Sequence, residues 1–278
     1  MPNKKKVVLV TGASSGIGNA CATHLAKKGY SVYGTSRNPA AKPRRVDEFF
    51  ELVRMDVSNN DDVEAVISYI TAKENVLDAI ICCAGIGIAG ALEEIPIIEA
   101  QRQFDVNFMG VARLAKAGLP LLRASKGHFI VIGSIAGLFG VPFQSYYSAS
   151  KCALTGLVDS LRMELYSNHV KTSLVLPSDF RTGFTSARAI YGLGADSPYG
   201  LKGKKAIAIM EQNERYGADP IIVARLMLKL LNKKRLRPRY SLGPLLQRTA
   251  VFIARILPKA FTEIILLYYY RQKGDKSL

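Results

Sequence analysis

The 278-residue sequence has few of the features that mark several special classes of protein. It contains only four cysteines, Cys21, Cys82, Cys83 and Cys152, and these lack the paired spacing of metal ligands. We therefore expect no metal site and no disulfide framework, and a reduced intracellular compartment fits better. With 49% hydrophobic and 22% charged residues, the chain is expected to fold around a substantial core.

Long apolar runs are also scarce. The basic N-terminus is followed by an apolar run of only four residues, Val7–Val10, which is too short for the core of a secretory signal. Residues 127–150 contain no Asp, Glu, Lys or Arg, but Gly133, Gly137 and Pro142 interrupt them. We interpret this stretch as a buried strand that leads into a site-forming loop, and not as a membrane span.

Acidic residues are scarce in one part of the chain. The 38 Lys and Arg outnumber the 22 Asp and Glu, which gives a formal net charge of +16. Residues 201–278 contain 17 of the basic residues but only 5 of the acidic ones. The excess charge therefore belongs to the C-terminal quarter, and we expect no nucleic-acid partner, because little aromatic interleaving and no known binding module accompany it.

Short apolar runs alternate with helical patterns along most of the chain. The predicted strands are Val7–Val10, Ser31–Thr35, Glu51–Met55, Ala79–Cys83, Phe129–Ile132 and Thr172–Leu176. The predicted helices are Gly16–Lys28, Asp61–Lys73 with Ser58 or Asn60 as its cap, and further ones within Ile98–Arg123 and Tyr147–Ser167. A last helix and strand are expected between Ala218 and Gly243. This alternation is typical of an α/β, Rossmann-type fold, a doubly wound parallel sheet with helices on both faces.

A glycine-rich turn, Thr11-Gly-Ala-Ser-Ser-Gly-Ile-Gly18, joins the first predicted strand to the first helix. Gly12 allows a tight turn, Gly16 lets the backbone approach a pyrophosphate, and Gly18 lets the helix pack closely on the strand. The helix N-terminus adds free N–H groups and the positive end of its dipole. We predict a dinucleotide site here; a glycine-rich turn without a ligand is the structural alternative.

The Thr-Gly-x₃-Gly-Ile-Gly pattern resembles that of the short-chain dehydrogenase/reductase family, whose members also carry a Tyr-x₃-Lys pair. The chain holds three such pairs, Tyr69–Lys73, Tyr147–Lys151 and Tyr269–Lys273. Of the three, Tyr147–Lys151 follows a strand and a loop rich in Gly and Ser. Ser134, thirteen residues before Tyr147, and Asn107 complete the Asn-Ser-Tyr-Lys tetrad of the family at matching separations.

The resemblance implies a role for each member of the tetrad. Tyr147 is the general acid in reduction and the general base in oxidation, and Ser134 donates a hydrogen bond to the substrate oxygen. Lys151 lies one helical turn after Tyr147, so its charge is expected to lower the phenol pKa. Lys151 is also expected to hold the nicotinamide ribose, and Asn107 to anchor a relay water through a break in its helix.

The cofactor choice depends on the end of the second strand. No acid occurs between Val7 and Val46, whereas Arg37 offers a donor fork suited to a 2′-phosphate, with Ser14 and Lys42 or Arg44 as candidate helpers. We therefore favour NADP(H) over NAD(H). The cofactor site implied by the resemblance is Gly12, Ser14, Ser15, Gly16, Ile17, Gly18, Arg37, Asp56, Val57, Ala84, Gly85, Asn107, Tyr147, Lys151, Pro177 and Thr182.

Two positions depart from the family pattern. Cys82-Cys83 stands where the family has Asn-Asn, which removes polar side chains that brace the sheet. Pro177-Ser178 stands where the family has Pro-Gly. Neither change removes a predicted catalytic group, but both affect how the cofactor is positioned.

We predict an NADP(H)-dependent oxidoreductase that interconverts a ketone or aldehyde and an alcohol. A hydrophobic substrate is expected, because the loops near the site contain Ile86, Leu138, Phe139, Val141, Phe143, Phe180 and Phe184. The strand within residues 237–243 resembles members that act on steroids, retinoids and other lipids. A non-catalytic NADP-binding regulatory or scaffold protein is the alternative, and the intact tetrad argues against it.

The predicted domain covers residues 1–243, and residues 244–278 form a basic, amphipathic helical extension divided by Pro258. Peripheral contact with anionic lipid through residues 233–270 is one interpretation. The other is that these helices cover the substrate pocket or a dimer partner. The resemblance implies a homodimer or homotetramer, and we expect a cytoplasmic protein, with or without contact to a membrane surface.

Overall fold

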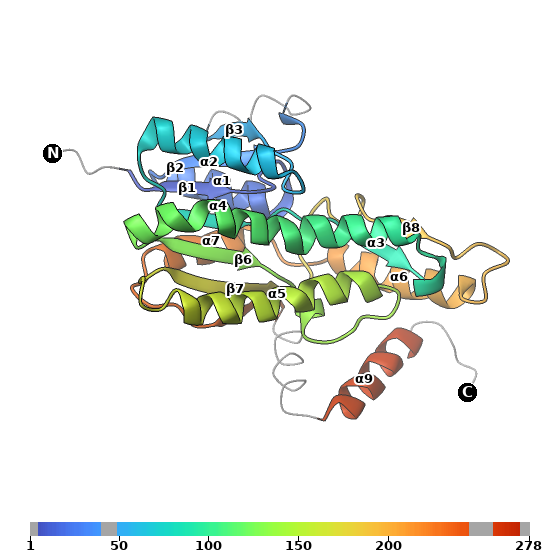
Figure 1. The fold of residues 1–278 in the computed structure, drawn as a ribbon. Helices are drawn as coiled ribbons and strands as arrows, with labels where there is room; N and C mark the ends of the chain where they lie inside the picture. Colours follow the sequence, from blue (N-terminus) through green and yellow to red (C-terminus); the bar gives the residue numbers. More distant parts are fainter. Residues whose placement is uncertain (1–4, 40–48, 245–257, 273–278) are drawn as a thin grey trace.

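The computed structural model describes residues 5–39, 49–244 and 258–272. Seven parallel strands form its main sheet in the order β3-β2-β1-β4-β6-β7-β9 (Figure 1). These strands are β1 (Val7–Val10), β2 (Ser31–Ser36), β3 (Glu51–Arg54), β4 (Ala79–Cys82), β6 (His128–Ile132), β7 (Lys171–Pro177) and β9 (Arg239–Leu242). The doubly wound parallel sheet is therefore confirmed, and each predicted strand lies within one or two residues of its expected bounds.

Helices cover both faces of this sheet. α1 (Gly16–Lys27) and α7 (Ile221–Leu231) pack together on one face, and α2 (Asn60–Glu74), α4 (Gly110–Ser125) and α5 (Ser145–Glu164) cover the other. The central strand β1 is buried along its whole length, because Val7 and Leu9 contact one helical layer while Val8 and Val10 contact the other. A continuous β-branched run is what such a strand requires.

The long helical pattern predicted over Ile98–Arg123 consists of three consecutive pieces. α3 (Ile97–Phe104) continues through a π-helical turn, Asp105–Met109, into α4. The π turn places Asn107 at the irregularity that the family resemblance implied. At the start of α2 the predicted cap was wrong by one residue, since Asn59 accepts the capping hydrogen bond from the backbone N–H of Asp62.

Several elements at the carboxyl edge of the sheet were not predicted. β5 (Ile88–Gly90) and β8 (Ala189–Tyr191) pair as a separate two-stranded sheet, and α6 (Gly200–Arg215) follows β8. By contrast, α9 (Lys259–Gln272) lies in the predicted helical extension, begins directly after Pro258 and contacts α6. The rest of the predicted C-terminal extension, residues 245–257 and 273–278, lies outside the described residues. Among the helices of the described ranges, none is both long and apolar enough to cross a membrane.

Candidate active site

A cavity of about 1100 Å³ runs along the carboxyl edge of the main sheet. Parallel strands all end at this edge, and ligands of open α/β sheets bind there. Every predicted site residue except Asn107 lines the cavity, from the glycine-rich turn at one end to Tyr147 and Thr182. Asn107 lies immediately behind the wall, where its side chain both accepts from and donates to the backbone of Ile86 at 2.9 and 3.0 Å.

Two glycines of the turn are required by its geometry. Gly12 has φ +64°, and a Cβ on it would lie 2.9 Å from Ala84 Cα. A Cβ on Gly18 would lie 2.3 Å from the carbonyl oxygen of Gly12. Ser15 begins α1 without a side-chain cap, so the first-turn N–H groups are not taken by that side chain. The turn therefore presents bare backbone and a helix N-terminus to the cavity, which fits a pyrophosphate.

Thr11 holds the backbone of the segment in which Cys82-Cys83 stands where the family has Asn-Asn. Its buried hydroxyl accepts hydrogen bonds from the N–H groups of Cys83 and Ala84, both at 3.1 Å. Cys82 packs into the core on the α2, α4 and α5 side, whereas Cys83 packs toward α1. The thiols thus point to opposite faces, as adjacent residues at the end of a strand do, and the backbone after β4 is held from the glycine-rich turn.

The end of the cavity beside β2 is polar. Arg37 is exposed there, next to Asp56 and Val57. Burial favours the neutral form of Asp56, but hydrogen bonds from Ser58 and the positive charge of Arg37 outweigh it and lower the carboxyl pKa. A carboxylate thus faces Arg37 across this end. The predicted helpers Lys42 and Arg44 lie outside the described residues.

Tyr147 stands on the first turn of α5, at the middle of the cavity. Its hydroxyl is hydrogen-bonded to Ser134, which follows β6. Burial raises the pKa of Tyr147 to about 12, although the Ser134 hydrogen bond acts in the opposite direction. We expected Lys151 to lower this pKa, and that expectation is wrong for the protein alone, because burial outweighs the favourable interactions of the phenolate.

Lys151 lies one turn later on α5, and its ammonium is 5.8 Å from the centre of the Tyr147 ring. The residue is only 5% exposed, and its Nζ donates a hydrogen bond to the carbonyl of Ile132 at 3.3 Å. Burial lowers the pKa of Lys151 to about 8. Gly85 lies beside the ammonium: a Cβ on it would be 3.6 Å from Nζ, an ordinary contact distance.

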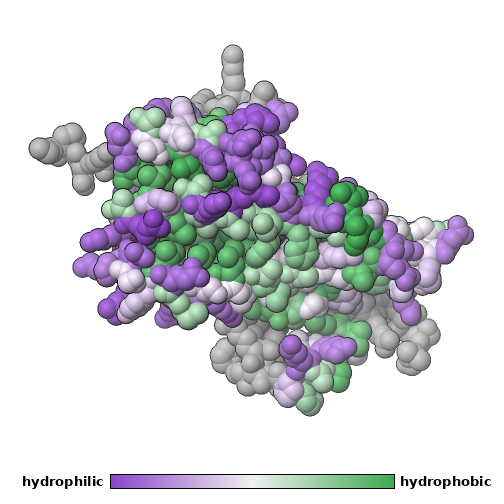
Figure 2. All heavy atoms as spheres, viewed as in Figure 1, coloured by the Kyte–Doolittle hydropathy of each residue, from purple (hydrophilic) through white to green (hydrophobic). Residues whose placement is uncertain are grey.

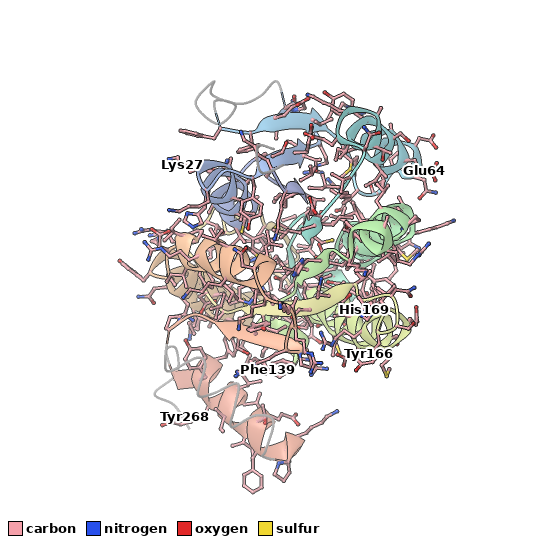
Figure 3. The ribbon with its side chains drawn as sticks, turned by 90° about the vertical axis from the view of Figure 1, so that its left-hand side faces the viewer. Lys27, Glu64, Phe139, Tyr166, His169 and Tyr268 are labelled. Carbon is pink, nitrogen blue, oxygen red and sulfur yellow. The ribbon has the colours of Figure 1, made fainter. Side chains whose placement is uncertain are left out.

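The wall beyond Tyr147 is mostly apolar, as predicted. Ile86, Phe139, Val141, Phe180 and Phe184 line it, and the Phe184 ring lies 5.7 Å from that of Tyr147. Phe139 lies on the side of the molecule where α9 is found (Figure 3). Two expectations were wrong: Leu138 packs on the core instead, and Phe143 packs with Ala89 and Leu193.

Sequence reasoning missed the groups that close this end of the cavity. Arg188 and Glu214 form an ion pair that lines it, and α9 contributes apolar and phenolic side chains: Ile265, Leu266, Tyr269 and Tyr270. Asn213 on α6 donates a hydrogen bond to the hydroxyl of Tyr269 at 2.7 Å. A helical pattern in residues 200–215, with buried Ala206, Ile207 and Met210, was the signal available in the sequence.

Comparison with known proteins gives a consistent result. The sequence profile of the short chain dehydrogenase family matches residues 6–189. A 3-ketodihydrosphingosine reductase from Bacteroides thetaiotaomicron is 36% identical over 95% of this chain and 98% of its own. Human retinol dehydrogenase 8 is 37% identical over 64% of this chain and 60% of its own.

Solved structures show the same relationship. A short-chain dehydrogenase from Streptomyces avermitilis superposes with a TM-score of 0.83 at 26% identity, covering 99% of both chains. An alcohol dehydrogenase from Thermococcus sibiricus, complexed with 5-hydroxy-NADP, has a TM-score of 0.71 at 25% identity and covers 87% of this chain and 97% of its own. The chain therefore belongs to the short-chain dehydrogenase/reductase family of oxidoreductases.

Proposed function

We propose that the protein is an NADP(H)-dependent oxidoreductase that reduces the carbonyl group of a hydrophobic substrate to an alcohol. The observation that carries this proposal is the continuity of one cavity. The bare backbone of the glycine-rich turn forms one end, the hydrogen-bonded Ser134–Tyr147 pair stands in the middle, and an apolar wall forms the other end. A dinucleotide and an apolar carbonyl compound would meet beside Tyr147.

Each residue of the tetrad has a separate role in the reduction of the carbonyl group. When bound, the nicotinamide supplies a hydride to the carbonyl carbon, and negative charge develops on the oxygen. Ser134 donates a hydrogen bond to that oxygen, and Tyr147 donates its proton. With a pKa of about 12, Tyr147 keeps this proton throughout the neutral range, as reduction requires. The positive charge of Lys151 stabilises the resulting phenolate, and Asn107 fixes the backbone of Ile86 at the cavity wall.

The cofactor end supports NADP(H) over NAD(H). Arg37 is exposed at the end of β2, where a 2′-phosphate would lie, and its guanidinium can bind phosphate through two parallel hydrogen bonds. Ser14, Asp56 and Val57 complete this part of the cavity. The alcohol dehydrogenase from Thermococcus sibiricus, solved with 5-hydroxy-NADP, agrees with this choice.

The substrate end supports a lipid-like compound. Its lining is aromatic and aliphatic, and α9 extends the apolar surface beyond Phe184. The names of the two curated relatives, a 3-ketodihydrosphingosine reductase and a retinol dehydrogenase, both describe lipid chemistry. We therefore place the substrate among long-chain ketones and retinoids, with steroid ketones as a further group to test.

α9 also offers a surface for a partner. Phe261, Ile264 and Tyr268 follow one stripe of this helix and are 56–61% exposed. Figure 2 shows both hydrophobic and hydrophilic residues on the visible side of α9. Lys259 starts α9, and the neighbouring α6 carries Lys202, Lys204 and Lys205. We propose that this stripe rests on an anionic membrane surface, from which a lipid substrate enters the cavity.

We further propose a cytoplasmic homodimer or homotetramer, with residues 1–243 as the catalytic domain and 244–278 as its extension.

Removal of the Tyr147 hydroxyl tests the proposed reaction. We expect Tyr147→Phe to lower kcat/KM for ketone reduction about 100- to 10,000-fold, because the proton donor is lost. The assay measures NADPH oxidation with 3-ketodihydrosphingosine, all-trans-retinal and steroid ketones, and Tyr146→Phe is the matched control. Equal rates for the wild type and Tyr147→Phe on every accepted substrate would contradict the mechanism.

Deprotonation of Lys151 should limit reduction at high pH. The buried ammonium has a pKa of about 8, so its stabilising charge is present below pH 8 and is lost as the pH rises through that value. We expect kcat/KM for reduction to fall above pH 8, with a slope approaching tenfold per pH unit. Lys151→Arg, which keeps its charge, should show a smaller fall relative to its own rate at pH 7. A flat wild-type profile from pH 7 to 9.5 would refute this role.

Arg37 should set the cofactor preference. Loss of its charged hydrogen bonds in Arg37→Ala is expected to weaken NADPH binding about 10- to 100-fold and to change NADH binding little. Fluorescence titration of both cofactors measures the ratio, and Lys28→Ala removes an equal charge elsewhere as a control. An unchanged NADPH-to-NADH ratio would place the phosphate site elsewhere.

The membrane proposal depends on the exposed stripe of α9. We expect the wild type to float with vesicles that contain phosphatidylserine, and the double variant Phe261→Glu, Ile264→Glu to remain unbound. Leu92→Glu, which changes another exposed apolar residue away from α9, should float like the wild type. Absence of the wild type from the vesicle fraction would rule the proposal out.

A further inference from the structure

A polar cluster lies within the otherwise apolar substrate end of the cavity. Glu214 is on the last turn of α6, and its carboxylate accepts a hydrogen bond from the Thr185 hydroxyl at 2.5 Å. Its other oxygen pairs with Nη2 of Arg188, the residue before β8. The neighbouring elements α6, β8 and α9 gather at this end of the molecule (Figure 1). Two separate segments, the loop before β8 and α6, thus bring charge into a wall built from Phe184, Met210 and α9.

Arg188 has further N–H donors that its ion pair with Glu214 does not use. Its side chain has 0% exposure, and Nε and Nη1 have no hydrogen-bond partner among the described residues. Buried unpartnered guanidinium nitrogens cost free energy and are uncommon in folded proteins. Arg188 lies in the wall of the cavity, and its side chain has to turn toward the cavity for an oxygen atom of a bound substrate to satisfy these donors.

The cluster is close enough to act at the reacting position. The guanidinium carbon of Arg188 lies 5.7 Å from the centre of the Phe184 ring, which in turn lies 5.7 Å from the Tyr147 ring. The charge of Arg188 lowers the pKa of Tyr147, and that of Glu214 raises it. A polar substituent a few bonds from the carbonyl carbon would therefore reach the Glu214–Arg188 pair.

The charges of the carboxylates at this end of the cavity determine which polar group on a substrate can bind there. Glu214 is 15% exposed and can accept further hydrogen bonds, and a second carboxylate, Asp179, lines the same end. Carboxylates in an apolar cavity repel an anionic headgroup and favour a protonated amine. A hydroxyl oxygen beside that amine supplies the acceptor that Arg188 lacks. The surrounding aromatic and aliphatic wall suits an alkyl chain.

We infer that the Glu214–Arg188 pair is a headgroup subsite that selects ketones with an adjacent amino-alcohol group. The protonated amine binds Glu214, and the hydroxyl oxygen accepts from Arg188. This inference rests on the proposed reduction of hydrophobic ketones and identifies which of them the site prefers. Glu214 and Arg188 are specificity-determining residues in this scheme, whereas Tyr147 and Ser134 act on the carbonyl itself.

Three probes of equal chain length test the subsite: 2-amino-1-hydroxydodecan-3-one, its N-acetyl derivative, and dodecan-3-one. N-acetylation removes the positive charge and keeps the carbon frame. We expect the wild type to prefer the free amine over the N-acetyl compound by about 10- to 100-fold in kcat/KM. In Glu214→Gln the preference for the free amine over the N-acetyl compound should fall to about threefold or less. Glu211→Gln, on the same helix but away from the cavity, should keep the wild-type ratio.

A wild-type ratio near one, or a full ratio in Glu214→Gln, would overturn the inference. Thr185→Val, which removes the hydroxyl that holds Glu214, should lower the ratio partly and serves if Glu214→Gln does not fold. Reduction of dodecan-3-one that depends on Tyr147, together with a ratio near one, would refute the subsite and leave the proposed function standing.

If no ketone is reduced, the proposed function fails, and binding then decides the subsite. Calorimetry measures the affinity of 2-aminododecane-1,3-diol and its N-acetyl derivative for the NADP⁺-saturated protein. Tighter binding of the free amine to the wild type than to Glu214→Gln supports the subsite. Equal binding to both proteins overturns it.

Discussion

The position of one buried ammonium group constrains the whole site. Lys151 is held against the end of β6 through the carbonyl of Ile132, and burial lowers its pKa. Its charge is retained at neutral pH because the lowered pKa, about 8, still lies above 7. Gly85 is close to Nζ, and Asn107 packs behind the same wall. Tyr147, one turn away on α5, is thereby fixed beside a cation at the middle of the cavity.

The same edge of the sheet also fixes the other two parts of the site. The hydroxyl of Thr11 joins the glycine-rich turn to the backbone after β4, and Ser134 follows β6 directly. The strands concerned, β1, β4 and β6, are neighbours in the main sheet, so the phosphate end and the carbonyl end of the cavity are built on the same sheet edge. The apolar end is different, because it is built from β5, β8, α6 and α9, outside the main sheet.

This division explains how much could be predicted from the sequence. The turn around Gly12 and the Tyr147–Lys151 pair depend on local spacing and were predicted, whereas the break at Asn107 was implied by the family resemblance. The ion pair of Arg188 and Glu214 joins residues 26 apart through a loop and an unpredicted helix, so no local pattern indicated it. The pKa of Tyr147 was predicted in the wrong direction because burial depends on the assembled wall. Of the roles expected for the C-terminal helices, α9 has the one over the cavity, which it lines with Ile265, Leu266, Tyr269 and Tyr270, and contact with a membrane stays a proposal.

The central claim is that the cavity brings a nicotinamide and a carbonyl carbon together for direct hydride transfer. The most direct test is a single turnover with NADPH that carries two deuterium atoms at C4 of the nicotinamide, followed by mass spectrometry and NMR of the alcohol. We predict one deuterium on the carbinol carbon in ordinary water, and none when unlabelled NADPH reacts in heavy water. A carbinol hydrogen that originates from solvent would contradict direct transfer in this cavity.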